Sequence, residues 1–276
     1  MNSLVYRVKG GLGNQLFIYA FSLAFNKFKN HNIYYDNISG FIRNDFSHIQ
    51  TNKFLLDKYF PNIKKPKIHV LFLLHIIRKF KIKGSIFDYI HDEFNLLDEA
   101  NAKILSNKTY LIEGYFQNFK LISDSIPEIR KTIKYKPLSN QVDLDNLSLI
   151  NKSNSIAIQI RVNDYNVPIP KDYIYKSINI LKGKFDNPHW FLFTDNLEWC
   201  KLNLNLPSNI IYINSGDDEI DFKLMTSCKH FILTLGTFGW WGAMLSLNNE
   251  KEVFYPIKFK EYLNKNLFPL NWECIN

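Results

Sequence analysis

The sequence predicts an α/β protein with two α/β halves and parallel sheet structure. Three observations favour this fold class. Short runs of branched and aromatic residues alternate with segments of helical period along most of the 276 residues. A glycine-rich loop follows the first such run directly, as in a strand–loop–helix unit. The chain length and a hydrophobic content of 46% suffice for two modest domains, which we expect at residues 1–150 and 151–276.

The glycine loop organises the first half of the chain. Residues 9–17 read KGGLGNQLF, between a strand-like apolar run at 4–8 and an apolar helical segment at 18–28. Three glycines in four positions let a backbone turn tightly and come close to a ligand, and N–H groups at a helix start favour a phosphate. An amide pair follows them and can bind hydroxyls or phosphate oxygens. The residues expected at a ligand are therefore Gly10, Gly11, Gly13, Asn14 and Gln15.

One interpretation of this loop is a dinucleotide-binding fingerprint. Gly11 and Gly13 supply two of its glycines, and Asp36 closes the next strand-like run at about the ~20-residue distance of a ribose-binding acid. Leu16 stands where the third glycine would allow close packing of helix and strand. This interpretation predicts an NAD(P)-dependent oxidoreductase.

A basic segment lies in the middle of the first half. Residues 37–60 predict a loop with a short helix, and residues 109–122 predict a strand, a turn and the start of a helix. Between them, residues 58–83 contain no acid but carry clustered Lys and Arg around an apolar run at 70–77. The run is too short to span a bilayer. It predicts either a helix lying on an anionic membrane through residues 64–83 or a buried helix with solvated lysines.

A polar linker is expected at residues 136–155, which open with Pro137 and run through Asn, Asp and Ser. Its Asp143 and Asp145 have the Asp-x-Asp spacing that holds a metal at the end of a strand. Because they lie in a polar connector, we expect a solvated loop and no metal site.

Strands and helices alternate most clearly in the second half. The apolar runs predict strands at 155–160, 190–194, 210–213, 231–235 and, as the last one, 253–255. The intervening segments predict helices at 171–182, from 199, at 217–228 and after 236. This alternation is typical of a parallel sheet with helices on both faces.

Composition excludes several classes of function. The net charge of +8 suits a phosphorylated substrate or an anionic lipid surface, but the chain has no nucleic-acid-binding motif. Three cysteines match no metal or disulfide spacing and indicate a reducing compartment. The chain shows no signal-peptide pattern, and no apolar run approaches the ~20 residues that span a bilayer. We expect a cytoplasmic protein that needs no metal or cofactor.

Polar clusters fall at the predicted carboxyl ends of strands, where open parallel sheets bind their ligands. The glycine loop and residues 161–165, 195–196 and 236–242 all occupy such positions. Their placement predicts a nucleotide-sugar site between two α/β halves.

These clusters also carry a family resemblance. The string KGGLGNQLF with the following Tyr-Ala closely resembles the N-terminal motif of the α-1,2-fucosyltransferase family, glycosyltransferase family 11. Residues 113–118 resemble its Gly-Tyr-x-Gln segment. Residues 159–165 resemble its His-x-Arg-Arg-x-Asp-Tyr motif in part, with Gln159 in place of the histidine and Val162 in place of the second arginine.

The second half contains further matches. Residues 191–201 resemble the family's Ser-Asp-Asp segment and its Glu-Trp-Cys-Lys tail, with Asn196 in place of the second acid. Residues 221–230 resemble its Asp-x-x-Leu-Met-Ser-x-Cys-Lys-His, and Trp-Trp-Gly follows at 240–242. Before Trp-Trp-Gly the family usually has Asn-Ser-Ser-Phe-Ser, whereas this chain has LGTFG at 235–239 and keeps one hydroxyl.

The resemblance implies an inverting glycosyltransferase of the GT-B type, in which two Rossmann-like domains face each other across a cleft. It implies GDP-β-L-fucose as the donor and a galactose hydroxyl of a bacterial-type surface glycan, such as O-antigen, as the acceptor. The linkage would be α-1,2, with the acceptor on residues 1–150 and the donor on 151–276. The departures at Gln159, Val162 and Gly236 leave GDP-colitose as an alternative donor. A non-catalytic glycan-binding protein is a third interpretation.

The resemblance also implies roles for individual residues. Arg161 has the planar fork that suits a pyrophosphate oxygen and would stabilise the leaving group without a metal. Asp164 would deprotonate the acceptor or orient Arg161. Asp195 would accept from the N1–H and N2–H₂ edge of guanine. Besides the glycine loop, the expected donor-binding residues are Gln159, Arg161, Thr194, Asp195, Asn196, Gly236 and Thr237, and the expected acceptor-binding residues are Tyr115, Gln117 and Tyr165.

Overall fold

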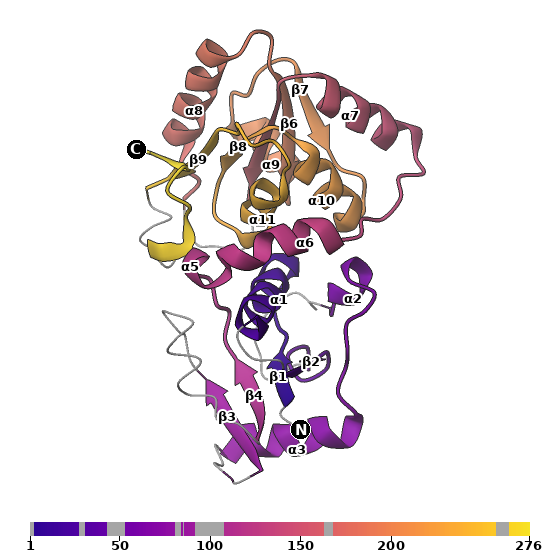
Figure 1. The fold of residues 1–276 in the computed structure, drawn as a ribbon. Coiled ribbons are helices and arrows are strands. Elements are labelled where there is room, and N and C mark those ends of the chain that lie inside the picture. The colour runs from indigo at the N-terminus through magenta and orange to yellow at the C-terminus, as the bar shows by residue number, and fades with distance from the viewer. Residues whose placement is uncertain are drawn as a thin grey trace. The chain divides into compact units, whose positions relative to one another are not determined.

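The computed structural model describes residues 3–27, 31–42, 53–80, 84, 86–91, 108–162, 168–257 and 265–276. The chain forms two compact units, Met1–Lys134 and Tyr135–Asn276, each with its own sheet (Figure 1). Every described strand pair in both sheets is parallel. The predicted α/β class with two Rossmann-like parallel sheets is therefore confirmed.

The first unit has a four-stranded sheet in the order β2-β1-β4-β3. Its strands are β1 (Ser3–Arg7), β2 (Asn32–Asp36), β3 (Phe87–His91) and β4 (Thr109–Glu113). Its helices are α1 (Leu12–Asn26), α2 (Leu56–Tyr59), α3 (Ile68–Phe80), α5 (Phe119–Ile122), the 3-10 turn η1 (Ser123–Ser125) and α6 (Ile126–Thr132).

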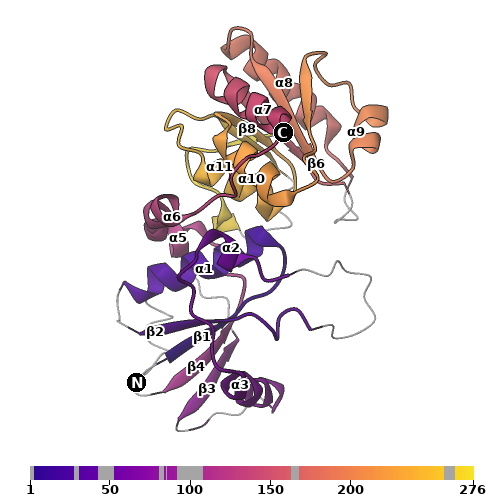
Figure 2. The same ribbon diagram turned by 90° about the vertical axis from the view of Figure 1, so that its right-hand side faces the viewer.

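Helices α1 and α3 cover opposite faces of this sheet. Successive side chains of a strand point to opposite faces. In β1, Val5 packs against Leu74 and Ile77 of α3. The next residue, Tyr6, meets Phe21 of α1 edge to face, with the ring centroids 6.1 Å apart. Figure 2 shows the resulting three layers of the first unit.

The second unit has a six-stranded sheet in the order β10-β9-β8-β5-β6-β7. Its strands are β5 (Ser155–Ile160), β6 (His189–Thr194), β7 (Ile210–Ile213), β8 (His230–Leu233), β9 (Val253–Pro256) and β10 (Glu273–Ile275). Its helices are α7 (Gln141–Lys152), α8 (Lys171–Lys184), α9 (Leu197–Asn203), α10 (Asp218–Ser227), α11 (Thr237–Leu245) and the 3-10 turn η2 (Lys265–Leu267).

Strand β5 is buried along its whole length, which explains its apolar sequence SIAIQI. Ile156, Ile158 and Ile160 belong to the core cluster that includes the buried residues of α8. The alternate residue Gln159 lies against Gly239 of α11. Because the two sets alternate, α8 and α11 cover opposite faces of the sheet, and Gln159 faces α11.

The polar linker expected at residues 136–155 is mostly a helix, and that prediction was wrong. The Asn140 side chain caps α7 by accepting from a backbone N–H in its first turn. Asp143, which was expected in a solvated loop, lies in that first turn and is buried. Asp145 accepts a hydrogen bond from a side chain one turn earlier. The acids of this segment therefore belong to a helix, whose polar composition concealed its period.

Helix α7 belongs to the second unit, so the division between the two units lies earlier in the chain than the sequence predicted. The helix packs against β5 and α10, so the compact units divide after Lys134, whereas the sequence placed the division at residue 150. The sequence analysis also missed β3 and β10, which are short edge strands of their sheets. Residues 253–255 are thus not the last strand, because β10 pairs with β9 beyond them.

We predict that Gly40→Ala destabilises the first unit. A Cβ at Gly40 would lie 1.8 Å from the carbonyl oxygen of Val8, and a backbone atom cannot move aside. Overpacking of this kind costs about 1–3 kcal/mol of unfolding free energy, occasionally more. Urea and thermal unfolding measure the loss. Gly183→Ala is the matched control, since a Cβ there, in the last turn of α8, meets nothing within 4 Å. Equal stability of the two variants would contradict this packing.

Candidate active site

The carboxyl ends of β5, β6 and β8 meet at one edge of the second sheet. Arg161 follows β5, and its backbone N–H donates to the Thr234 hydroxyl, which follows β8, at 3.0 Å. The next backbone N–H, of Val162, donates to the Asp195 carboxylate at 2.7 Å. The Arg161 Nε lies 3.3 Å from the other carboxylate oxygen of Asp195. Two residues expected to bind the donor therefore form an ion pair at this edge.

Both carboxylate oxygens of Asp195 have partners within the protein. One of its oxygens accepts from a backbone N–H, the other faces Arg161, and its side chain is only 13% exposed. This geometry orients the guanidinium. Asp195 also lines the cavity described next, and each of its oxygens can accept a further hydrogen bond, so the contact with guanine that the resemblance implied stays a prediction.

A cavity of about 120 Å³ lies beside the ion pair. Four of the residues that line it were expected at the donor: Gln159, Arg161, Thr194 and Asp195. Sequence reasoning missed six others: Ile160, Phe193, Asp218, Asp221, Met225 and Phe238. The signal that could have identified the two acids is their place in the first turn of a helix that begins at this same edge.

The acids at the start of α10 have different roles. The Asp217 carboxylate caps the helix by accepting from the backbone N–H of Glu219 at 2.9 Å. Asp221 accepts from the hydroxyl and the backbone N–H of Ser215, at 2.6 and 3.1 Å. Burial raises the pKa of the Asp221 carboxyl, and the Ser215 hydrogen bonds offset this only in part. Asp218 and Asp221 also line the cavity.

Helix α11 brings its N-terminus to the same edge. Gly236 precedes it with φ of 141°, and no side chain caps the helix. Thr237 is its first residue. Gln159 lies against this first turn with 4% of its surface exposed, and its Oε1 has no hydrogen-bond partner among the described residues.

Asn196 caps a helix, and its expected contact with the donor stays a prediction. Its side-chain oxygen accepts from the backbone N–H of Trp199 at 3.0 Å and so starts α9. The Thr194 hydroxyl accepts from the Asn196 backbone at 3.2 Å. These bonds fix the turn that presents Asp195.

The glycine loop lies in the first unit. Gly10 has a φ of 77°, and Gly11 precedes α1 without a side-chain cap. Gln15 is fully buried, and its amide group donates to the carbonyls of Gly10 and Lys53 at 2.9 and 2.7 Å. Its Oε1 accepts from the backbone of Leu55 at 2.8 Å. The ligand contact expected of Gln15 is therefore corrected, since this side chain braces the loop instead.

A charged cluster occupies the carboxyl edge of the first sheet. The Arg7 guanidinium at the end of β1 pairs with Glu113 at the end of β4. Lys9 lies 3.2 Å from the same Glu113 oxygen, and the Tyr89 hydroxyl donates to the other at 2.9 Å. Burial by itself raises the pKa of Glu113, but Arg7, Lys9 and the Tyr89 hydrogen bond outweigh it and hold that pKa below its usual value. Glu113 is therefore ionised at neutral pH.

One predicted binding residue, Tyr115, contacts this cluster, and two others contact each other. The Gln117 amide donates to the Asn14 side chain at 2.8 Å, which ties the β4–α5 loop to the start of α1. Lys9 lies over the Tyr115 ring, 4.6 Å from its centroid. Asn14, expected at the donor, and Gln117, expected at the acceptor, thus share one site in the first unit.

Asp36 does not serve a dinucleotide. Its Oδ1 accepts from the backbone N–H groups of Ile38 and Ser39, each at 2.9 Å, and its Oδ2 accepts from the Ser39 hydroxyl. The residue is 2% exposed. Because both oxygens hold the turn after β2, the dinucleotide interpretation loses its ribose-binding acid.

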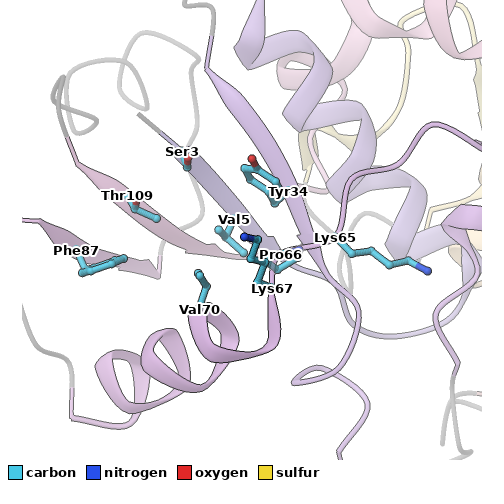
Figure 3. Close-up of a pocket in the computed structure, with 9 residues that line it drawn as sticks. All are labelled: Ser3, Val5, Tyr34, Lys65, Pro66, Lys67, Val70, Phe87 and Thr109. Atoms are coloured by element: carbon cyan, nitrogen blue, oxygen red, sulfur yellow. The ribbon is translucent and has the colours of Figure 1, made fainter. Parts of the chain in front are cut away.

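A larger cavity, of about 370 Å³, lies at the opposite edge of the first sheet (Figure 3). It is lined by Ser3, Phe87 and Thr109, the first residues of their strands, and by Val70 of α3. Ligands of parallel sheets bind past the carboxyl ends of the strands, and no predicted site residue lines this cavity among those described. We therefore place the candidate site at the carboxyl edges.

Two expected residues, Asp164 and Tyr165, lie outside the described part of the chain. Among the residues that are described, no group of three His, Cys, Asp or Glu side chains is arranged to hold a metal ion. In that same part, no helix combines the length and apolar character needed to cross a membrane.

Two Escherichia coli proteins resemble the chain along nearly its whole length. An α-1,2-colitosyltransferase is 29% identical over 262 residues, which cover 89% of this chain and 88% of that protein. The O-antigen biosynthesis glycosyltransferase WbnK is 26% identical over 290 residues, covering 94% of this chain and 95% of that protein.

Solved structures share the fold. The fucosyltransferase NodZ from Bradyrhizobium matches with a TM-score of 0.52 and 12% identity, over 88% of this chain and 91% of its own. POFUT1 in complex with GDP-fucose matches with a TM-score of 0.50 and 12% identity, over 90% of this chain and 96% of its own. The family model of glycosyl transferase family 11 matches residues 3–276. With the motifs of both sheets at their carboxyl edges, the chain belongs to glycosyl transferase family 11 and is a glycosyltransferase.

Proposed function

We propose that the enzyme transfers L-fucose from GDP-β-L-fucose to O2 of a galactose residue in a bacterial-type surface glycan, with inversion at the sugar. The observation that carries this proposal is the Arg161–Asp195 pair beside a cavity at the carboxyl edge of the second sheet. GDP-colitose is the alternative donor, favoured by the α-1,2-colitosyltransferase relative. Colitose is L-fucose without its 3-hydroxyl, so the two donors differ in a single group.

Arg161 is the residue that we assign to the leaving group. A guanidinium binds two phosphate oxygens in one plane, and Asp195 already holds it in position before the donor arrives. The uncapped N-terminus of α11 offers backbone N–H groups to the same diphosphate. Such preorganised donors stabilise the charge that develops as the sugar–phosphate bond breaks.

The guanine edge needs a carboxylate that can accept from two N–H groups. Asp195 and Asp218, which both line the cavity, are the acids that we assign to the base. Asp164 remains the proposed general base for the acceptor hydroxyl.

The acceptor is assigned to the first unit. Tyr115 offers an apolar ring face beside the ionised Glu113, and Gln117 and Asn14 offer amide groups. This combination of an aromatic face with hydrogen-bonding groups suits a neutral sugar.

A panel of nucleotide sugars tests the function. We expect turnover with GDP-fucose or GDP-colitose and a galactoside acceptor, because the cavity acids suit guanine. UDP-galactose and dTDP-rhamnose are expected to remain unchanged, and NADH is expected to cause no thermal shift. Transfer from a UDP- or dTDP-sugar, with no binding of GDP, would refute the proposal.

Substitution of the ion pair tests the assigned mechanism. Arg161→Lys keeps the charge but loses the planar fork, and we expect kcat to fall by about 10²-fold, as for loss of one preorganised donor. Asp195→Asn is expected to have a smaller effect of the same kind. The control is Lys184→Gln, which removes one positive charge from an exposed pair with Glu252. Steady-state kinetics with GDP-fucose measure kcat. A kcat for Arg161→Lys equal to that of Lys184→Gln would contradict the assignment.

We also propose that α3 contacts an anionic membrane. Its inner residues are buried against the sheet, yet Ile68 and Phe72 on its outer side are each 69% exposed and Phe80 is 65% exposed. Lys67 and Lys79 flank these side chains and are exposed. Apolar side chains ringed by lysines suit insertion between anionic head groups. Lys81 and Lys83 of the predicted contact lie outside the described residues.

Vesicle co-sedimentation tests the membrane proposal. We expect binding to phosphatidylcholine vesicles that contain phosphatidylglycerol, and loss of that binding in Phe72→Glu. Leu202→Glu is the matched control, since Leu202 is 83% exposed in the second unit. Equal binding to vesicles of phosphatidylcholine alone, or a Phe72→Glu variant that only dissociates a dimer in size-exclusion chromatography, would overturn it.

A further inference from the structure

We infer that Gln159 and Gly239 act as one unit that sets donor specificity. Gln159 of β5 contacts a hydroxyl of the transferred sugar, and Gly239 of α11 provides the space that its side chain needs. This inference rests on the proposed function, because it concerns the same pocket. Both positions depart from the family motifs, which have His and Ser there, and the structure brings these two departures into contact.

The contact between the two residues leaves no room for a side chain on α11. A Cβ at Gly239 would lie 2.7 Å from Oε1, 2.9 Å from Cγ and 3.0 Å from Cδ of Gln159. Gln159 is itself 4% exposed, in a strand that is buried throughout. The glutamine therefore fills the volume that a residue at 239 would otherwise occupy.

The side-chain carbonyl oxygen of Gln159 has no hydrogen-bond partner in the part of the chain that the structure describes. This oxygen, Oε1, is buried, and the side chain lines the cavity that also contains Arg161. Buried polar atoms are nearly always satisfied, so an orphan in a ligand cavity indicates a group that the ligand completes. The terminal amide torsion is soft enough to turn toward that ligand.

The kind of ligand group that can bond to the Gln159 Oε1 follows from the chemistry of that oxygen. A carbonyl oxygen needs a hydrogen-bond donor, and an ionised diphosphate offers none. The hydroxyls of the transferred sugar are the donors nearest to the diphosphate in a nucleotide sugar. Gln159 thus binds the sugar while Arg161, two residues along the strand end, binds the phosphate.

Affinity measurements test the contact with the sugar. In Gln159→Leu, which keeps the bulk but removes the amide, we expect GDP-fucose to bind about tenfold more weakly, whereas GDP binding changes by less than about twofold. An equal loss for both ligands would overturn the sugar contact. Absence of GDP binding in the unsubstituted enzyme would instead refute the proposed function.

A double-mutant cycle tests the coupling without any ligand. We expect Gly239→Ala to lower the melting temperature and to weaken GDP-fucose binding, because the added methyl displaces Gln159. In a Gln159→Ala background the same substitution is expected to have little effect on either. Gly183→Ala is the control for replacing a helical glycine. Equal losses in both backgrounds would show that the two residues are independent.

Discussion

The parallel pairing of β5 with β6 and β8 is the constraint on which the candidate site depends. It brings three strand ends to one edge, so that residues far apart in the sequence meet there. Backbone N–H groups after β5 bond to Thr234 and Asp195 at the ends of its two neighbours. Arg161 is thereby held against Asp195, at the mouth of a cavity, by the same bonds that finish the sheet. A shift in strand register would dismantle the site.

The carboxyl edge of the first sheet also brings together residues from different strands, and here they form a charged cluster. The strand ends bring Arg7 and Glu113 together, and Lys9 and Tyr89 complete the hydrogen bonds of the carboxylate. A charge in such a position is stable only when it is paired, and despite burial Arg7, Lys9 and Tyr89 together keep the pKa of Glu113 below its usual value. Lys9 also lies over the Tyr115 ring, so the cluster contacts the loop that follows β4.

Several residues that were expected at a ligand form hydrogen bonds with the backbone of the protein. Gln15 braces the glycine loop, Asn196 caps α9, and Asp36 holds the turn after β2. Amides and carboxylates satisfy backbone groups as readily as they bind substrates. From the sequence alone these two uses look the same, because the backbone partners come from distant segments such as residues 53–55.

The sequence by itself determined the fold class, the family and the strand ends that carry Arg161, Asp195 and Thr237, because hydrophobic period and local motifs are written along the chain. It did not reveal α7, whose helical period was concealed by a polar composition. Only the tertiary structure decided which polar side chains remain available to a ligand and that Gln159 fills the space beside a glycine 80 residues later. Such facts depend on contacts between distant segments, and no pattern within one segment encodes them.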